Sequence, residues 1–490
     1  MNIRHWSKNE GLFFFAGVTL LYVYPFILAN YVYIDDGFRS IAGDANWNSE
    51  GRFLMTAFYK ALSLTGKAPD MFPLPLILAV VLMAFALSSL QRHYFAVTDF
   101  FNAIVVLPLF FNPFFLSNLN YQYDGPLMTL GVIAMAFFIT FDTQRRWLQW
   151  SVPMLLIVAA LATYQPLLNV GFGLCCIELY RKLIDPEKCS ELAAFVGKKL
   201  VQFGVAFLVY MAAVSQIMAT DRRGTLALDS TLYATLVARF EHLQALLSPL
   251  YAGAAQWFFV LMLALAGLGY IARGWEVLKS RRGYLNKALA SALYLLIPCL
   301  LVACVPGVML IYSAEQNDSR LMLGVAPFLV FILLLIDDFL SRIHARARWV
   351  LVLPLLFMIG FSYSYGRLLV AKKELENTLV NSLAYSISAN AQLSAVGKFY
   401  FSAETDYFWL PAAQGTISAM PIMPYVMSTG FLLMPYGISR AGITNVDWED
   451  TLHPASAVLD SHIAPVLENK FYAIYVFKGD GYIIMKTMGR

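Results

Sequence analysis

The chain has 490 residues, of which 59% are hydrophobic and only 13% are charged, and its formal net charge is +4. Soluble domains carry about 25% charged residues, and half of that share cannot coat a globule of this size in water. The composition therefore excludes a soluble enzyme, a disordered chain and a nucleic-acid-binding protein. Together with a mean hydropathy of +0.62, it indicates a polytopic α-helical membrane protein.

Eleven apolar runs along the chain are candidates for membrane-spanning helices, which need about 20 predominantly apolar residues. They lie near residues 11–32, 73–90, 99–116, 125–141, 148–163, 166–180, 199–219, 251–272, 288–311, 321–338 and 349–366. The fifth and sixth runs are short and flank a turn at 163–166, so they predict a tight helical hairpin, and merging them would lower the count. The first run follows basic residues without a small-residue cleavage motif, which favours an uncleaved span over a signal peptide.

The loops between these runs differ in their content of Lys and Arg. With the N-terminus in the cytoplasm, the inner segments hold 17 Lys and Arg, whereas the longer outer loops hold only 8. Because positively charged loops tend to stay in the cytoplasm, this asymmetry predicts an inner N-terminus and an outer C-terminal segment. None of the five cysteines falls in an outer loop, so no exported disulfide framework is predicted. In the fourth outer loop, apolar residues at helical spacing in 226–247 predict an interfacial or connecting helix.

The chain divides into a predicted membrane domain, residues 1–366, and a predicted C-terminal α+β domain, residues 367–490. In the second, two β-rich runs flank the Gly-Asp-Gly turn at 479–481 and predict a hairpin. A helical stretch near 372–393 and a strand near 399–403 complete this domain. We expect it to be a lid or a docking platform without catalytic groups.

The first predicted outer loop begins with two adjacent carboxylates, Asp35 and Asp36, at the boundary between the first span and water. Adjacent carboxylates repel each other, so one can be held with a raised pKa, which favours general-base chemistry or the binding of a cation. Arg39 and Arg52 in the same loop offer bidentate donors for a phosphate or a carboxylate. With Trp47 between them, these residues predict a functional site, although the two Asp could instead cap a helix in the loop.

The other predicted outer loops are also rich in polar side chains. Residues 112–124 suit a hydroxyl-rich ligand, because amide and carboxylate groups bind sugar hydroxyls and aromatic rings cover the apolar faces of sugars. Anchoring of Tyr at the membrane interface would explain the tyrosines there, but not Asn118 or Asp124. Further candidates are Tyr164 and Gln165 in the third turn, Arg222 as a phosphate clamp in the fourth loop, and Glu315, Asn317, Asp318 and Arg320 in the fifth. Snorkelling of Arg320 to the interface is the alternative for that residue.

These motifs resemble one known family. The run Asp35-Asp36-x-x-Arg39, followed by Trp47 and Gly51-Arg52, is similar to the bacterial type II O-antigen glucosyltransferases. So are the Asn112-Pro113-Phe114 stretch with Asn118, Tyr121 and Asp124, the Tyr164-Gln165 turn, and Asn317-Asp318-Ser319-Arg320. The resemblance extends over the first ten spans and not over the C-terminal domain. It implies a GT-C type enzyme of the bacterial inner membrane that inverts the anomeric centre and takes a sugar from a polyprenyl-phosphate carrier on the periplasmic face.

The resemblance also implies partners and residue roles. The donor would be undecaprenyl phosphate glucose and the acceptor an O-antigen repeat of lipopolysaccharide, and the enzyme would work beside a flippase and a carrier-loading glucosyltransferase. Many GT-C enzymes place a catalytic Asp in the first outer loop, which corresponds here to Asp35 or Asp36, and Asp35 is preferred because it is nearer the span. This Asp would deprotonate the acceptor hydroxyl. The leaving phosphate would be stabilised by Arg39, Arg52, Arg222 or Arg320. The sugars would be bound by Trp47, Glu50, Asn118, Tyr121, Asp124, Tyr164, Gln165, Glu315, Asn317 and Asp318.

No cofactor is required besides the lipid-linked donor, whose tail would lie against aromatic-rich spans. No HExxH, Walker A, GxGxxG or paired CxxC motif occurs and the histidines are scattered, so no metal site is predicted. The Asp pair could nevertheless bind a divalent cation.

The main alternative is a transporter or flippase of a lipid-linked sugar. Transporters usually carry polar or broken positions at mid-span in matched halves, whereas the polar groups of this chain cluster on one side and eleven spans do not divide evenly. Further alternatives are a transferase of the same architecture that acts on teichoic acid, lipid A or protein, and a ligase or polymerase of whole glycan chains.

Overall fold

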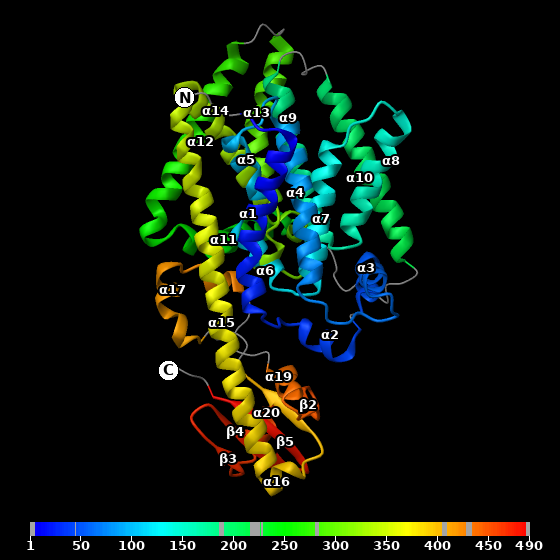
Figure 1. Ribbon diagram of the computed structural model, residues 1–490, viewed down its shortest axis with the longest axis vertical. Helices are drawn as coiled ribbons and strands as arrows, with labels where there is room; N and C mark the ends of the chain where they lie inside the picture. Colours follow the sequence, from blue (N-terminus) through cyan, green and yellow to red (C-terminus); the bar gives the residue numbers. More distant parts are fainter. Residues whose placement is uncertain are drawn as a thin grey trace.

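The structure, a computed structural model, describes residues 5–44, 46–185, 191–215, 226, 229–279, 284–403, 409–427 and 434–486. Most of these residues are helical, and a small sheet lies near the C-terminus. Figure 1 shows a bundle of long helices at one end of the molecule and the sheet at the other, with the yellow helix α15 running from the bundle to the sheet.

Fifteen helices in the described part of the chain belong to the bundle or to the loops at its end. They are α1 (Lys8–Ala29), α2 (Asp36–Ala42), α3 (Phe53–Ser63), α4 (Leu74–Tyr94), α5 (Phe100–Val106), α6 (Pro113–Leu119), α7 (Asp124–Thr140), α8 (Arg146–Leu161), α9 (Leu168–Ile184), α10 (Leu192–Val214), α11 (Leu232–Leu247), α12 (Gln256–Lys279), α13 (Tyr284–Cys304), α14 (Val325–Ile343) and α15 (Val352–Ala389). Short 3-10 helices precede α9 at Gln165–Leu167 (η3) and α14 at Ser319–Leu321 (η8).

Each of the eleven predicted apolar runs overlaps at least one of these helices. Within the described residues, six helices are long and apolar enough to cross a membrane, or seven if the bent pair formed by Phe100–Leu109 and Pro113–Leu119 is one span. That pair is bent by 59°, where Asn112 caps α6 by accepting the N–H of Phe115 and Pro113 occupies the first helical position. The expected membrane character is therefore supported, while the count of eleven spans and the GT-C architecture stay predictions.

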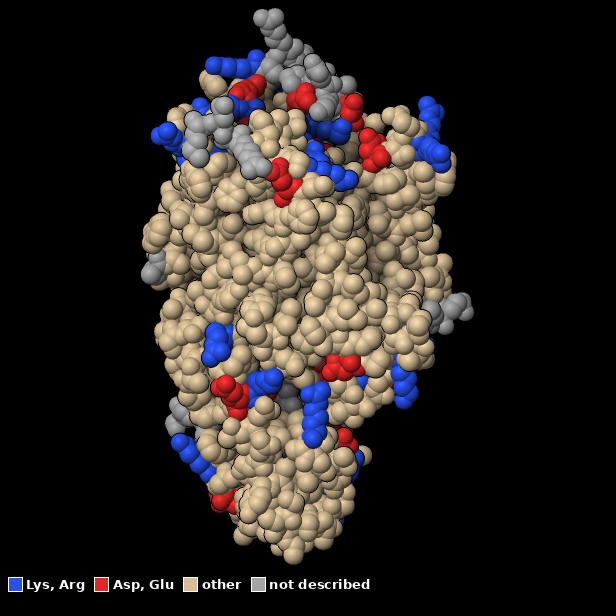
Figure 2. All heavy atoms as spheres, in the orientation of Figure 1, with Lys and Arg blue, Asp and Glu red and all other residues tan. Residues whose placement is uncertain are grey.

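Charged side chains are distributed unevenly over the surface. On the face shown in Figure 2, Lys, Arg, Asp and Glu gather towards the two ends, and a broad band between them carries none among the described residues. The start of α1 and the sheet lie at opposite ends (Figure 1). This pattern is typical of a protein whose middle part is in contact with hydrocarbon.

The helices around α1 form the centre of the bundle. α1 packs against α4 and α15, and α4 packs against α7. The contact between α1 and α15 is close, since a Cβ atom added to Gly366 of α15 would lie 2.3 Å from the Cβ of Pro25. The predicted turn at 163–166 is confirmed: α8 ends at Leu161 and η3 leads directly into α9. These contacts bring the loops after α1, after α6 and before α9 to the same end of the bundle.

Within the described residues, the C-terminal sheet has five strands in the order β2-β1-β5-β4-β3. The strands are β1 (Phe399–Ser402), β2 (Val446–Trp448), β3 (Leu467–Glu468), β4 (Tyr472–Phe477) and β5 (Asp480–Met485). The predicted hairpin is confirmed, because β4 and β5 pair antiparallel around Lys478 and Gly479, which both have positive φ as a tight hairpin turn requires. β1 pairs parallel to both β2 and β5.

Five short helices lie in the described part of the chain after α15: α16 (Ala391–Ser394), α17 (Gln414–Ala419), α18 (Met423–Met427), α19 (Met434–Arg440) and α20 (Ala455–Asp460). Of these, α18 packs against α6 and η8 of the bundle, whereas α19 packs against α15 and β2. One face of the sheet packs on the last turns of α15, where Leu379, Leu383 and Ile387 share a hydrophobic core with strand residues. α15 is unbroken across residue 366, so the predicted boundary between the two domains falls inside a helix. The division itself stays a prediction.

Candidate functional site

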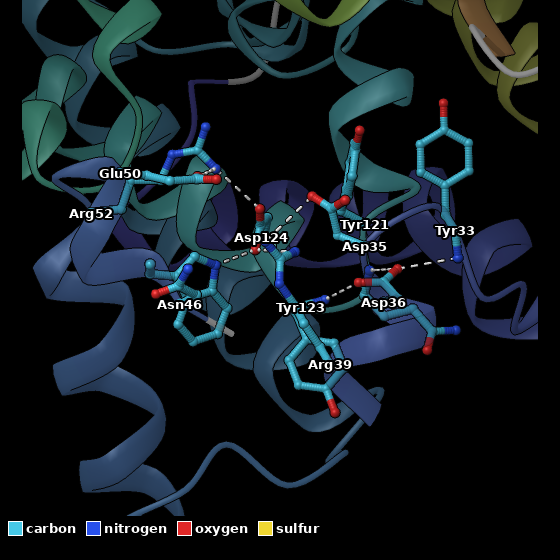
Figure 3. Close-up of polar contacts among 12 residues, drawn as sticks. Tyr33, Asp35, Asp36, Arg39, Asn46, Glu50, Arg52, Tyr121, Tyr123 and Asp124 are labelled. Atoms are coloured by element: carbon cyan, nitrogen blue, oxygen red, sulfur yellow. Dashed lines mark hydrogen bonds and ion pairs between the residues drawn. The ribbon is translucent and has the colours of Figure 1, made fainter. Parts of the chain in front are cut away.

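The two carboxylates at the start of α2 lie in different environments. Asp36 is buried, and its oxygens accept the backbone N–H groups of Tyr33 at 3.3 Å, Gln122 at 2.8 Å and Tyr123 at 3.2 Å. These bonds join the loop after α1 to the loop before α7 (Figure 3). Burial raises the pKa of Asp36 to about 8, although the N–H donors of Gln122 and Tyr123 act in the opposite direction. Asp36 therefore holds the two loops together.

Asp35 is the more accessible of the two, with 37% of its side chain exposed. One carboxylate oxygen lies 3.4 Å from Nη2 of Arg39, one turn further along α2. Partial burial raises the pKa of Asp35, and the positive charges of Arg39 and Arg320 counteract this, whereas Asp124 and Glu50 add to it. Asp35 is thus an open carboxylate with a raised pKa, which is the state that a general base requires.

Asp124, the first residue of α7, connects three side chains of the first loop. Its Oδ1 accepts the indole N–H of Trp47 at 2.7 Å and lies 2.9 Å from Nη1 of Arg39. Its Oδ2 lies 3.3 Å from Nη1 of Arg52. In Figure 3, Asp124 stands between the two arginines. Because Asp124 and Arg39 are both buried, these contacts organise the loop from inside.

Arg52 and its neighbours extend the network towards the start of α9. Nη1 of Arg52 lies 3.1 Å from Glu50, and its guanidinium lies over the ring of Tyr164 at 5.1 Å. Gln165 donates to the backbone oxygen of Glu50 at 3.0 Å and to the hydroxyl of Tyr210 on α10 at 2.9 Å. The turn at 163–166 therefore packs against the loop after α1, as a site shared by the two segments requires.

Arg320 approaches the site from η8. Its Nη1 donates to the hydroxyl of Tyr121, and its Nη2 lies 3.2 Å from Asp318. Asn118 donates to the backbone oxygen of Arg320 at 3.0 Å, which ties η8 to α6. Burial lowers the pKa of Arg320, but Tyr121, Tyr164 and Asp318 outweigh this effect and leave the pKa above its ordinary value, so Arg320 stays charged.

Three guanidinium groups of the site have unused donors. The Nε–H groups of Arg39, Arg52 and Arg320 are buried and have no hydrogen-bond partner among the described residues. Buried donors are nearly always satisfied in folded proteins, so unsatisfied ones at a single place call for a ligand. Three positive groups of this kind favour an anionic ligand such as a phosphate.

Some predicted residues lie elsewhere. Glu315 lies 3.0 Å from Nδ1 of His242 on α11, and Asn317 approaches the same nitrogen at 3.1 Å. Both side chains therefore join the fifth loop to the predicted interfacial helix rather than to the arginines. Arg222 lies outside the described residues. Among the described residues, no group of three or more His, Cys, Asp and Glu side chains could hold a metal ion.

Tyr33 and Tyr210 are among the residues at the site that were not predicted. Tyr33 packs edge-on against Tyr121, with ring centroids 4.8 Å apart, and donates to the backbone oxygen of Met427 in α18. Tyr210 reaches the site from α10, and its hydroxyl donates to the backbone oxygen of Gly51 at 3.3 Å. Tyr33 lies two residues before the Asp pair and could have been found, whereas Tyr210 lies inside an apolar run that gives no such signal.

An apolar cavity lies on the α12 and α15 side of the same end of the bundle. A space of about 380 Å³ is lined by Trp257, Phe357, Phe361 and Met420, among others. A second space of about 110 Å³ shares Leu250, Phe258 and Phe357 with it and extends to Phe114 of α6. Phe114 lies one turn before Asn118 on α6, and Asn118 donates to the backbone oxygen of Arg320.

Comparison with known proteins gives one family and one distant relative. The family described as Glucosyl transferase GtrII matches residues 24–336, a range that contains the entire predicted site. The uncharacterized 55.3 kDa protein in the gtrB 5' region of Salmonella phage P22 is 23% identical over 216 residues. That alignment covers 44% of this chain and 44% of the phage protein, so the chain spans less than half of the relative that it matches. No solved structure matches the chain.

Proposed function

Because the chain belongs to the Glucosyl transferase GtrII family, we propose that it is an inverting glycosyltransferase that transfers glucose from undecaprenyl phosphate to O-antigen repeats of lipopolysaccharide. It would act on the periplasmic face of the bacterial inner membrane. The observation that carries the proposal is the open carboxylate of Asp35 beside Arg39, in a site where Arg39, Arg52 and Arg320 have unused buried donors. A base for a hydroxyl and a binding site for a phosphate are the two elements that this reaction needs.

The apolar cavity supports a lipid-linked donor. Its lining is almost entirely hydrocarbon and aromatic, as an isoprenoid chain requires, and burial of apolar surface would contribute about 25 cal/mol per Å². The phosphate at the head of such a chain would lie near Arg320 and Arg52, whose guanidinium groups are partly exposed. Arg39 is more deeply buried and contributes its charge from behind Asp35.

The proposed reaction is a single displacement at the anomeric carbon. The acceptor hydroxyl oxygen forms the new bond to this carbon while the bond to the phosphate oxygen breaks. The hydroxyl proton passes to Asp35, and undecaprenyl phosphate leaves with the electron pair of the broken bond. The arginines stabilise the charge that develops on the phosphate. A divalent cation is not needed for this balance, although one could assist the departure of the phosphate.

The other predicted residues fit supporting roles in this scheme. Trp47, Asp124 and Asn118 fix the loops, whereas Glu50, Tyr121, Tyr164 and Asp318 lie next to the arginines and would contact sugars. In the cell, the enzyme would depend on a carrier-loading glucosyltransferase and on a flippase that delivers the donor.

The experiment is glycosyl-linkage analysis of lipopolysaccharide from cells that make and flip undecaprenyl phosphate glucose, with and without this chain. We expect a new glucose branch with the wild-type chain and its loss with Asp35→Asn, since removal of a general base lowers a rate by about 10²–10⁴-fold. Asp44→Asn in the same exposed loop is the matched control and should retain the branch.

Membrane levels of each variant are compared by immunoblotting. Full branching with Asp35→Asn would contradict the proposed base. An unchanged glycan with the wild-type chain, together with movement of the labelled donor across the membrane, would favour a transporter.

A further inference from the structure

A pocket with polar walls, separate from the apolar cavity, lies where the loop after α1 meets α15 and α19. Its volume is about 120 Å³. Its walls come from three separate segments: Asn30, Tyr31, Val32, Ile34 and Gly37 of the loop, Lys373, Glu376, Asn377 and Val380 of α15, and Tyr436, Gly437 and Arg440 of α19. The reaction scheme above uses none of the residues from α15 and α19.

The backbones around this pocket approach each other unusually closely. A Cβ atom on Gly37 would lie 2.6 Å from the ring of Tyr436, and one on Gly437 would lie 2.8 Å from Val380. Ile34 adopts a left-handed conformation with φ of 39°, which a β-branched residue rarely does. Such strain persists where the surrounding structure enforces it, and it gathers at ligand-binding sites. The pocket is therefore a formed feature of the fold.

Several polar groups of the pocket are held in place by bonds to its walls. The hydroxyl of Tyr31 donates to Glu376 at 2.9 Å, and the ammonium of Lys373 donates to the backbone oxygen of Asn30 at 2.9 Å. Arg440 donates to Ser40 of α2. The side chain of Asn377 is exposed and makes no hydrogen bond to any described residue. Its amide can therefore both donate to a ligand and accept from it.

The pocket lies close to the proposed base, since burial and the negative charge of Asp35 raise the pKa of Tyr436 in the pocket wall. Ile34 and Gly37 in its wall flank Asp35 and Asp36 in the chain. We propose that this pocket is a subsite for one monosaccharide unit of the glycan acceptor, next to the unit whose hydroxyl Asp35 activates. The proposal rests on the proposed function and assigns part of the acceptor recognition to α15 and α19.

The chemistry of the walls favours a sugar over the alternatives. An amide, a carboxylate, two cations and the face of Tyr436 together match a ring that carries alternating hydroxyls and apolar C–H groups. The mixed charges disfavour a bare phosphate, for which Arg39, Arg52 and Arg320 with their unused donors are better suited. The small volume and polar walls disfavour a lipid chain, for which the larger apolar cavity is available.

The test uses the full-length chain in detergent and O polysaccharide released from the lipopolysaccharide of the host strain. Binding of the polysaccharide is measured by saturation-transfer NMR without any donor, and the KM values for acceptor and donor are measured separately. Asn377→Phe fills the pocket without breaking a bond. We expect it to weaken polysaccharide binding by about tenfold and to raise the acceptor KM to a similar extent, with an unchanged KM for undecaprenyl phosphate glucose.

Glu374→Phe places the same bulk on α15 outside the pocket and should behave as wild type, and thermal unfolding of each variant checks its folding. Asn377→Ala, which removes only the amide, should give a smaller loss of binding. Wild-type binding by Asn377→Phe, or a wild-type chain that does not bind the polysaccharide, would overturn the subsite. Binding that depends on Asn377 in a chain that transfers no glucose would support the subsite and contradict the transferase.

Discussion

Asp35 and Asp36 are neighbours in the chain, but their carboxylates differ in almost every physical respect. Asp36 is buried and accepts three backbone N–H groups. In contrast, more than a third of the Asp35 side chain is exposed, and its carboxylate lies 3.4 Å from Arg39. A group that holds three donors in place cannot readily approach a substrate. The two residues should therefore be separable by mutation.

We expect Asp36→Asn to lower stability, and Asp35→Asn to leave it nearly unchanged. An amide at position 36 would turn an N–H₂ group towards a backbone N–H of Gln122 or Tyr123, which costs about 1–3 kcal/mol for each unsatisfied donor. Thermal unfolding in detergent measures the difference. Equal unfolding temperatures for wild type and Asp36→Asn would contradict the structural role assigned to Asp36.

Removal of the charge of Arg320 and removal of the charge of Glu50 should shift the pH dependence of transfer in opposite directions. Arg320 lowers the pKa of Asp35 and Glu50 raises it. A base works only when deprotonated, so activity is lost as the pH falls through this pKa. Arg320→Gln should move the acid limb of kcat/KM to higher pH, and Glu50→Gln should move it to lower pH, each by up to about one pH unit. Shifts in the same direction in both variants would exclude Asp35 as the group that titrates.

At the level of elements, the close packing of α2 against α19 requires a glycine at position 37, because no side chain fits there. We expect Gly37→Ala to destabilise the protein by about 1–3 kcal/mol, because its Cβ would lie 2.6 Å from the ring of Tyr436. The double variant Gly37→Ala with Tyr436→Ala should recover part of this loss, and a double-mutant cycle of unfolding free energies measures the coupling. Gly17→Ala on α1, with open space around it, is the matched control and should be neutral.

Most elements could be predicted from the sequence because their signals are local. Helices in the apolar runs, the turn at 163–166 and the hairpin of β4 and β5 appeared as expected, whereas the count of eleven membrane spans stays a prediction. The unbroken passage of α15 across residue 366 was not predicted, since the apolar run ends there while the backbone remains helical. Loss of hydrophobicity predicts the end of a membrane span, but it does not predict the end of a helix.

It could also be predicted from the sequence that the polar loops form one site, but not which contacts each side chain makes. The polar loops on one side of the predicted membrane do contact each other. Arg52 pairs with Asp124, and Asn118 donates to the backbone oxygen of Arg320. The burial of Asp36, in contrast, depends on backbone N–H groups of residues 122 and 123, and no pattern in the sequence reports where a distant backbone will lie. The pairing of Asn317 with His242 is a tertiary contact of the same kind.

At the scale of the whole molecule, the predicted orientation can be tested by cysteine labelling. The native cysteines are replaced by Ala, and single cysteines are introduced at Ser388 near the end of α15 and at Ser341 near the end of α14, both exposed. We expect a membrane-impermeant maleimide to label position 388 in intact spheroplasts, and position 341 only after permeabilisation. The reverse pattern would contradict the orientation predicted from the Lys and Arg content of the loops.

α15 connects the bundle to the sheet as one continuous rod. It has 38 residues, so at a rise of ~1.5 Å per residue it is about 57 Å long, roughly twice the ~30 Å hydrocarbon thickness of a bilayer. About half of such a helix stands clear of the hydrocarbon, and its last turns carry the sheet through Leu379, Leu383 and Ile387. Unlike a flexible linker, a helix has a fixed length, so the sheet stands at one height above the bundle. A polymer anchored in the membrane would therefore contact the sheet at a fixed distance from its lipid anchor. The length of α15 would then determine which sugar units of the polymer the sheet can contact.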